Sequence, residues 1–329
     1  MIVILNSLDL SVVSDIARGL ADRYDAGAFV DIHRLGTQSG LDGASVTPCD
    51  EIGKLVASAK QRDRAHVVIK ETFETPEALK RLRVCLSAYD NEIYAFRLRF
   101  TAETFERVCA DLDPASGSVV SAAYAQWLEA QEAGACSGDM GYEMLIRSAD
   151  PTATIVAIWN DIHAPVELVP YQEQWPEMFL REQAQILAAL HPQPLSVEHI
   201  GSTAIPHMPA KPIIDILVSL DRLEDASRCI SPLRALGYAF IDYPQNTDRR
   251  FFRKGTPRSH HLHLVEQGSA SERDHLDFRD AILANDVLRQ EYLQLKSEAM
   301  HQHKDRRALY GERKGDFIRH ALATYRGEE

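Results

Sequence analysis

Residues 198–203 read EHIGST, and residues 211–218 read KPIIDILV. The first stretch ends an apolar run with a turn of small residues, in which Gly201 lets a phosphate approach the backbone and the next two residues offer hydroxyl groups. The second stretch is a strand pattern with one carboxylate, Asp215, among apolar residues. A phosphate-accepting turn followed by a carboxylate-bearing strand predicts a site for a metal ion and a nucleotide.

Composition indicates a soluble globular protein with two domains. At 329 residues the chain exceeds the usual size of one domain, and its 45% hydrophobic and 26% charged residues can supply a core to each half. Five cysteines without CxxC spacing fit reduced thiols better than disulfides or a zinc site. The start, MIVILNSLDLS, lacks the basic residues of a signal peptide, and no segment approaches the roughly 20 apolar residues that span a bilayer. We therefore expect a cytoplasmic protein with no membrane partner.

The charge distribution limits the classes of partner. The net charge is −12, and most of the acidic excess lies in residues 1–165. Non-specific nucleic-acid binding depends on a basic field that releases counterions. General nucleic-acid binding is therefore not expected, although a local basic patch remains open.

In the first half, β-rich runs alternate with helical patterns, which predicts a parallel sheet with helices on both faces. The expected strands are Ile2–Leu5, Phe29–His33, His66–Glu71, Glu92–Phe100 and Gly141–Arg147. The expected helices are Ser11–Tyr24, Glu51–Lys60, Pro76–Ser87, Ala102–Leu112, Ala122–Ala133 and Pro151–Ile162. Residues 163–174 contain two prolines and interrupt the preceding alternation of strand and helix patterns. We predict a linker there, between an α/β domain at 1–162 and a second domain at 175–329.

Residues 6–15, NSLDLSVVSD, lie where a P-loop kinase would bind phosphate. Such a loop needs glycines, a lysine and a hydroxyl group. When this stretch is aligned with such a loop, Ser7 and Val12 replace the glycines and Val13 replaces the lysine. At the position of the hydroxyl residue, Ser14 keeps a hydroxyl group. The half therefore resembles a degenerate P-loop kinase-like domain, and the alternative is a doubly wound domain that never bound phosphate. Its remaining roles are dimerisation in a homo-oligomer, substrate recognition, or holding the second domain.

The second half predicts an α+β arrangement, with a mixed sheet and helices around it. The expected strands are Leu195–Ile200, Ile213–Leu220, Ala239–Tyr243, Arg250–Lys254 and His261–Glu266. Helices are expected at Trp175–Leu190 and Leu223–Leu236, and over most of Glu272–Tyr325.

Several separated motifs in this half resemble those of the GrpB family, over about residues 166–325. They are VELVPYQEQWPEMF (166–179), EHIGSTAIPHMPAKPIIDILV (198–218), RRFFRKG (249–255), HLHLVEQGS (261–269) and LDFRDAI (276–282), followed by Lys296, Tyr310 and Lys314. The resemblance implies a nucleotidyltransferase-like fold, in a family often fused to a kinase-type domain such as dephospho-coenzyme A kinase.

Asp215 is the strongest candidate for a metal ligand. An ionised carboxylate in an apolar strand is costly unless it is paired or binds a metal. The alternative is a salt bridge to Lys211 or Arg250. Nucleotidyltransferases usually carry a second carboxylate two residues later, but that position is Leu217, which argues against a standard two-metal centre.

His261 and His263 alternate along a predicted strand and so lie on one face, whereas Glu266 is out of phase. With Asp215 they could bind one divalent ion, expected to be Mg²⁺ or Mn²⁺. One histidine could instead act as a general base near neutral pH. The alternative is a pair of satisfied core histidines.

Basic residues supply candidate phosphate contacts. Arg250 and Lys254 share one face of a predicted strand and are expected to bind phosphate. The alternative is that they lie on a solvated edge strand, where their charges oppose aggregation. Lys296, Tyr310 and Lys314 could close over the same site from the helical end, or they could lie on an ordinary helix surface.

Two functions follow. The first is an enzyme that binds ATP or another nucleoside triphosphate and acts on a small-molecule acceptor, by nucleotidyl transfer or by ligation through an acyl-adenylate. Asp215 would hold the metal, and His261 or His263 would complete its shell or remove a proton. The expected phosphate-binding residues are Gly201, Ser202, Thr203, Lys211, Arg250, Lys254, Lys296, Tyr310 and Lys314. The second function is a non-catalytic regulatory protein in which both nucleotide sites have degenerated.

Overall fold

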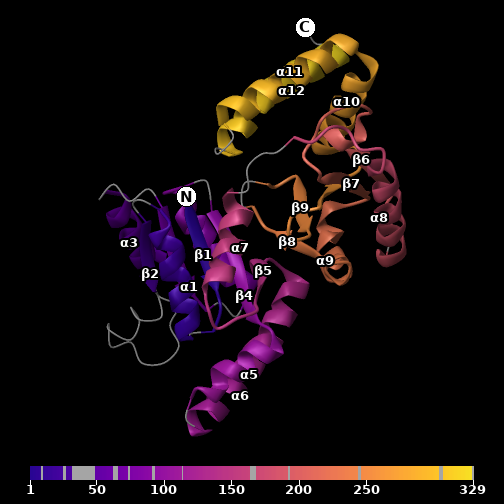
Figure 1. The fold of residues 1–329 in the computed structure, drawn as a ribbon. Helices are drawn as coiled ribbons and strands as arrows, with labels where there is room; N and C mark the ends of the chain where they lie inside the picture. The colour runs from indigo at the N-terminus through magenta and orange to yellow at the C-terminus, as the bar shows by residue number, and fades with distance from the viewer. Residues whose placement is uncertain are drawn as a thin grey trace. The chain divides into compact units, whose positions relative to one another are not determined.

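The computed structural model divides the chain into two compact units, Met1–Ile162 and His163–Glu329 (Figure 1). The structure describes residues 1–8, 10–24, 27–31, 49–61, 66–72, 75–90, 93–112, 114–163, 168–191, 193–243, 246–303 and 307–327. Among these residues no helix is long and apolar enough to cross a membrane.

A five-stranded sheet forms the centre of the first unit, in the order β2-β3-β1-β4-β5. Every neighbouring pair in this sheet is parallel, as the alternation of strands and helices predicts. The strands are β1 (Ile2–Asn6), β2 (Gly27–Asp31), β3 (His66–Glu71), β4 (Ile93–Phe100) and β5 (Tyr142–Ile146). The prediction of a parallel sheet is confirmed.

Helices cover this sheet on both faces. They are α1 (Ser11–Asp22), α3 (Cys49–Gln61), α4 (Pro76–Ser87), α5 (Ala102–Ala110), α6 (Pro114–Ser137) and α7 (Thr152–His163). Apolar residues of α3 and α4 pack with Ile2 and Ile4 of β1 in one buried cluster. On the opposite face, Ser14 of α1 contacts Lys70 of β3. Alternate residues of the central strands β1 and β3 therefore face helices on opposite sides of the sheet.

The second unit contains a mixed five-stranded sheet, in the order β6-β7-β10-β9-β8. Only β7 and β10 run parallel, and the other neighbours are antiparallel. The strands are β6 (Ser196–Ile200), β7 (Ile214–Leu220), β8 (Tyr238–Ile241), β9 (Arg249–Lys254) and β10 (His260–Glu266). The prediction of a mixed sheet in this half is also confirmed.

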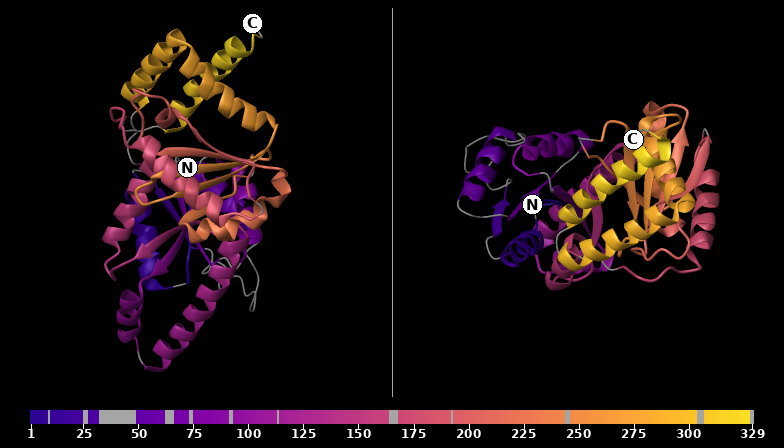
Figure 2. Two further views of the ribbon diagram at one scale, coloured as in Figure 1. Left: turned by 90° about the vertical axis from the view of Figure 1, so that its right-hand side faces the viewer. Right: turned by 90° about the horizontal axis from the view of Figure 1, so that it is seen from above.

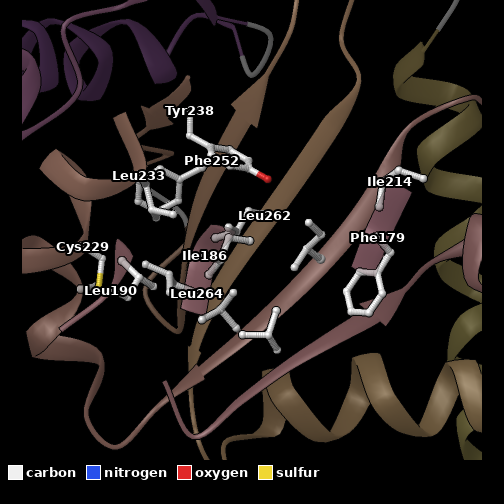
Figure 3. Close-up of a cluster of buried hydrophobic side chains, with 14 of the residues drawn as sticks. Phe179, Ile186, Leu190, Ile214, Cys229, Leu233, Tyr238, Phe252, Leu262 and Leu264 are labelled. Carbon is white, nitrogen blue, oxygen red and sulfur yellow. The ribbon is translucent and has the colours of Figure 1, made fainter. Parts of the chain in front are cut away.

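Helices α8 (Trp175–Ala189) and α9 (Ala226–Ala235) pack on one face of this sheet. Figure 3 shows that core, in which Phe179 and Ile186 of α8 belong to one cluster with alternate strand residues, among them Ile214 of β7 and Leu262 of β10. Because side chains alternate along a strand, the residues between these core positions project to the other face. Asp215 and His261 are among them.

The other face meets α10 (Ala270–Ala284), which packs in turn against α11 (Asp286–His303) and α12 (Arg307–Arg326). Figure 2 shows these three helices, orange to yellow, grouped together. Ser269 caps α10, because its hydroxyl accepts the backbone N–H of Glu272 at 3.1 Å. The three helices share a buried cluster that includes Phe278 and Tyr292. This packing brings helical residues to the sheet face that carries Asp215.

Part of the segment predicted as a linker belongs to the second unit. Val169 and Ala210 exchange backbone hydrogen bonds of 2.9 and 3.0 Å. The chain is therefore fixed to this unit before α8 begins.

Candidate functional site

Asp215 and His261 are cross-strand partners on the parallel strands β7 and β10. His261 Nδ1 lies 3.1 Å from Asp215 Oδ1. Both side chains are largely covered, with exposed fractions of 29% for Asp215 and 22% for His261. The sequence placed both residues at one site, and the structure brings them into direct contact.

Gly201 allows the Asp215 carboxylate to lie against the turn after β6. Its backbone has φ 69° and ψ −169°, a region open essentially to glycine alone. A Cβ at this position would collide with Asp215 Oδ2 and would lie 3.0 Å from Asp215 Cγ. The glycine of this turn therefore makes room for the carboxylate, whereas the sequence had suggested that it makes room for phosphate.

A pocket of about 190 Å³ opens beside the Asp215–His261 pair. Seven of the residues predicted for the site line it: Ser202, Thr203, Lys211, Asp215, His261, Lys296 and Lys314. The remaining lining residues are the aliphatic Leu168, Ala210 and Ile213. The pocket thus combines three ammonium groups with one carboxylate and one imidazole.

Asp215 carries a negative charge in this pocket. Burial acts to raise the pKa of its carboxyl group, but the hydrogen bond from His261 and the nearby positive groups, Lys314 among them, bring that pKa below its usual value. The ionised form is therefore stabilised by its neighbours.

Lys296 is buried, with 2% of its surface exposed. Its Nζ donates to the carbonyl oxygen of Pro209 at 2.6 Å. Burial, together with the positive charges of Lys314 and Lys211 and against the opposing effect of Asp215, lowers the pKa of Lys296 to about 7. The Lys296 amine can therefore gain or lose its proton near neutral pH.

Tyr292 of α11 is a site residue that sequence reasoning missed. Its hydroxyl lies 3.2 Å from Ser202 Oγ. The ammonium nitrogens of Lys296 and Lys314 lie 5.2 and 5.5 Å from the centre of its ring. The spacing of four residues between Tyr292 and Lys296 could have revealed the link, because such residues are neighbours on a helix.

The turn after Gly201 is held together by Thr203. The Thr203 hydroxyl donates to the carbonyl oxygen of Ile213 at 3.3 Å, and His199 Nε2 lies 3.0 Å from the same Thr203 oxygen. Burial lowers the pKa of His199 to about 4, so its ring is neutral. The Thr203 proton is used inside the turn, which argues against its predicted role as a phosphate donor.

His263 does not form a three-ligand metal site with Asp215 and His261. Its ring lies 5.2 Å from that of Phe251 and 5.0 Å from that of His275, and burial holds its pKa well below the usual value. Within the described ranges, no three His, Cys, Asp or Glu side chains lie close enough to share an ion. The predicted three-ligand site is therefore corrected.

Leu217, at the position of a second carboxylate, is fully buried with Ile200 and Val265. Asp215 is therefore the one acidic residue in β7 (Ile214–Leu220), and it lies on the face of the sheet that carries the pocket.

Arg250 and Lys254 lie on the face of the sheet opposite the pocket, which corrects the prediction that they bind phosphate. The register pairs His261 with Arg253, so the even-numbered residues of β9 point away from His261. Lys254 Nζ donates to both carboxylate oxygens of Glu182, at 2.8 and 3.0 Å. Arg250 donates to backbone carbonyls near its own strand.

Tyr310 falls within α12, but its side chain lies outside the part that the structure describes. Lys314, one turn later, is described and lines the pocket. Tyr310 therefore keeps only its predicted role.

In the first unit, protein groups occupy the position predicted for a phosphate loop. Lys70 Nζ donates to Ser14 Oγ at 2.9 Å and lies 3.1 Å from Asp31 Oδ2. Val13, aligned with the missing lysine, is fully buried. The hydroxyl of Ser14 is thus engaged by a buried lysine from β3.

The sequence model of the GrpB protein family matches residues 165–324. UPF0157 protein YqkA of Bacillus subtilis (strain 168) is 37% identical over 157 residues, which cover 47% of this chain and 46% of YqkA. Dephospho-CoA kinase of Mycobacterium tuberculosis (strain ATCC 25618 / H37Rv) is 31% identical over 171 residues, covering 44% of this chain and 41% of the kinase. The crystal structure of conserved protein GrpB from Enterococcus faecalis is similar with 32% identity and a TM-score of 0.44, over 48% of this chain and 99% of that protein.

The chain spans about half the length of the first curated relatives, 46% and 49%. Three other GrpB or UPF0157 proteins, 31% to 34% identical, are covered over 82%, 91% and 89% of their length. The family match lies in the second unit, and the kinase-like character of residues 1–162 stays a prediction.

Proposed function

This chain belongs to the GrpB protein family through residues 165–324, and from that premise we propose that its second unit is an enzyme acting on a nucleoside triphosphate. The proposed reaction transfers the nucleotidyl group to a small-molecule acceptor and releases pyrophosphate. The observation that carries the proposal is the pocket in which the Asp215–His261 pair meets Lys211, Lys296 and Lys314.

The three lysines supply the charge that a triphosphate requires. Lysine ammonium groups are compact point charges that bind phosphate oxygens, and their attraction is strengthened where water is largely excluded. Lys296 is buried, and Lys211 and Lys314 are half-buried. In the proposed reaction they stabilise the negative charge that develops on the leaving pyrophosphate.

The donor set fits a divalent ion only if the substrate supplies most of the ligands. Asp215 is one ionised carboxylate at the pocket, and Mg²⁺ is commonly held by one or two carboxylates together with substrate phosphates and water. Asp215 would hold Mg²⁺ or Mn²⁺ in this way. When bound, the ion would neutralise phosphate charge as a Lewis acid.

His261 is proposed to accept the proton of the acceptor. Its Nδ1 is engaged by Asp215, which fixes the ring, and its buried Nε2 has no hydrogen-bond partner among the described residues. In the proposed step the acceptor forms a bond to the α-phosphorus, its proton passes to Nε2, and the bond to pyrophosphate breaks. Because Nε2 is buried, the acceptor reaches it only after local opening of the pocket.

The same site supports ligation as a second outcome. A carboxylate acceptor would form an acyl-adenylate with release of pyrophosphate, and an amine would then displace the nucleotide. A regulatory function without catalysis is favoured by a different observation, the buried Leu217 where a second acidic ligand would stand. Release of pyrophosphate separates both catalytic outcomes from the regulatory one.

The test is calorimetric titration of Mg–ATP, Mg–GTP and Mg–CTP, repeated with Mn²⁺, into the wild type and two variants. Asp215→Asn keeps the side-chain volume but removes the charge, and we expect it to abolish saturable binding and pyrophosphate release. Lys254→Met lies on the opposite face and serves as the control, with wild-type affinity expected. Unaltered affinity in Asp215→Asn, or no binding of any nucleotide by the wild type, would exclude the proposed function.

A further inference from the structure

The part of the pocket that the structure describes is smaller than most sites for ligands of nucleotide size. Sites for drug-sized ligands usually enclose roughly 300–1,000 Å³, whereas this pocket measures about 190 Å³. It can hold a chain of phosphates, and the rest of the nucleotide then lies outside it.

The lining offers many groups for phosphate and few for a base. Proteins recognise bases by stacking on aromatic rings and by hydrogen bonds to their edges. Among the described lining residues the only ring is that of His261, whose Nδ1 is engaged by Asp215, and none carries an amide. The neighbouring ring of Tyr292 is fully buried and lies beneath Lys296 and Lys314. The described lining groups that can still hydrogen-bond, the Ser202 hydroxyl and the lysine amines, serve phosphate oxygens as well as a base edge, and none is the aromatic ring or amide that would select one base.

The positive groups also impose little orientation on their ligand. An arginine fork selects a planar, bidentate partner, but a lysine ammonium binds any oxygen within reach. Lys211, Lys296 and Lys314 can thus accept successive phosphates of a chain, whatever is attached to its end.

We infer that this pocket selects its substrate by the polyphosphate chain and is indifferent to the base. The inference rests on the proposed function, because it concerns the same site. It assigns all four nucleoside triphosphates as ligands of similar affinity, and inorganic tripolyphosphate, which carries one more negative charge, as a ligand that binds at least as tightly.

The experiment titrates the Mg²⁺ complexes of ATP, GTP, CTP, UTP and inorganic tripolyphosphate into the full chain, with adenosine as the ligand without phosphate. We expect the four nucleoside triphosphates to bind within about threefold of one another, tripolyphosphate to bind at least as tightly and to compete with each of them, and adenosine not to bind. One triphosphate that binds more than about tenfold more tightly than the others and than tripolyphosphate would overturn the inference and leave the proposed function standing. No binding by any of the five would overturn both.

A variant separates contact with phosphate from contact with the base. Lys314→Gln should weaken the four nucleotides by the same factor, about tenfold, and should also weaken tripolyphosphate, because the lost charge–phosphate contact is common to them. Arg250→Gln, on the opposite face, should leave all five affinities unchanged. If Lys314→Gln weakened the four nucleotides by different factors, the inference would be contradicted even if their wild-type affinities agree.

Discussion

His261 Nδ1 and Asp215 Oδ1 lie 3.1 Å apart across two neighbouring parallel strands. Parallel pairing puts both residues at the same level of the sheet and on the same face. The turn at Gly201 then closes against the carboxylate from β6, whose Ile200 is paired with Asp215. The acidic group of the pocket is thus fixed from both neighbouring strands.

The first prediction concerns Gly201→Ala. The substitution places a Cβ in a glycine-only region of φ and ψ and against Asp215, so we expect it to destabilise the second unit by about 3 kcal/mol or more. Gly268→Ala is the matched control, because Gly268 also has a positive φ, 71°, but no atom within 4 Å of an added Cβ. Gly268→Ala should lower the free energy of unfolding only by the backbone strain, about 1–2 kcal/mol. Urea unfolding of both variants measures the difference, and equal losses would contradict the close approach to Asp215.

The second prediction separates the two faces of the second sheet. Glu182→Gln removes the charge partner of Lys254, and since Glu182 is buried we expect a loss of about 1–3 kcal/mol in the free energy of unfolding. Nucleotide affinity should not change. Glu177→Gln, in the exposed pair with Arg181 on the same helix, should alter stability by less than about 0.5 kcal/mol. Weakened nucleotide binding in Glu182→Gln would contradict this separation and indicate that Lys254 contributes to the binding site.

The register of β9 explains why the sequence placed Arg250 and Lys254 wrongly. Alternation correctly predicted that these two residues share a face, but it does not say which face. A strand shifted by one residue presents every side chain to the other side, and here Arg253 is the residue opposite His261. The face is decided by pairing with β10 and by burial of Phe252 in the core, which are tertiary contacts.

Local patterns were more informative where one segment determines the structure. The strand around Asp215 is apolar on both sides, so its existence and its inward carboxylate could be inferred from residues 213–218 alone. Helical spacing links Tyr292 to Lys296, but the contact of Tyr292 with Ser202 could not be recognised in this way. On a helix an aromatic residue indicates a core position, and its contact with Ser202 depends on how α11 packs.

The third prediction concerns the first unit. If the kinase-like loop were merely missing its lysine, Val13→Lys would restore phosphate binding. Since Val13 is fully buried and Ser14 is already engaged by Lys70, we expect no gain in ATP affinity and a loss of about 3–5 kcal/mol from an unpaired buried charge. Ser11→Lys, at an exposed position of the same helix, should change stability by less than about 1 kcal/mol. Calorimetry and urea unfolding test both expectations, and ATP binding by Val13→Lys would refute this account.

The fourth prediction concerns Lys296 and pH. Its pKa is about 7 in the folded protein against 10.5 for an unperturbed lysine, so between these values the unfolded chain binds more protons than the folded one. The stability of the wild type should therefore rise with pH across this window, relative to Lys296→Met, by at most about 1.4 kcal/mol per pH unit. Below pH 7 the amine is charged in both states and this contribution stays constant. Urea unfolding of both proteins at pH 7 and pH 9 gives the difference, and a difference that does not change with pH would contradict the lowered pKa.

The fifth prediction treats Tyr292 as a positioning residue. Tyr292→Phe removes the hydroxyl contact with Ser202 but keeps the ring beneath Lys296 and Lys314, so we expect a cost of about 1 kcal/mol in stability and an almost unchanged affinity for Mg–ATP. Tyr292→Leu also removes the ring, and should cost about 3 kcal/mol and weaken Mg–ATP binding, because the two ammonium groups lose the surface that holds them. Tyr325→Leu makes the same change at an exposed position of α12 and should have little effect on either quantity. Urea unfolding and calorimetric titration distinguish the cases.

Wild-type affinity for Mg–ATP in Tyr292→Leu would show that the ring only fills the core. Equal weakening of Mg–ATP binding in both Tyr292 variants would assign the effect to the hydroxyl contact.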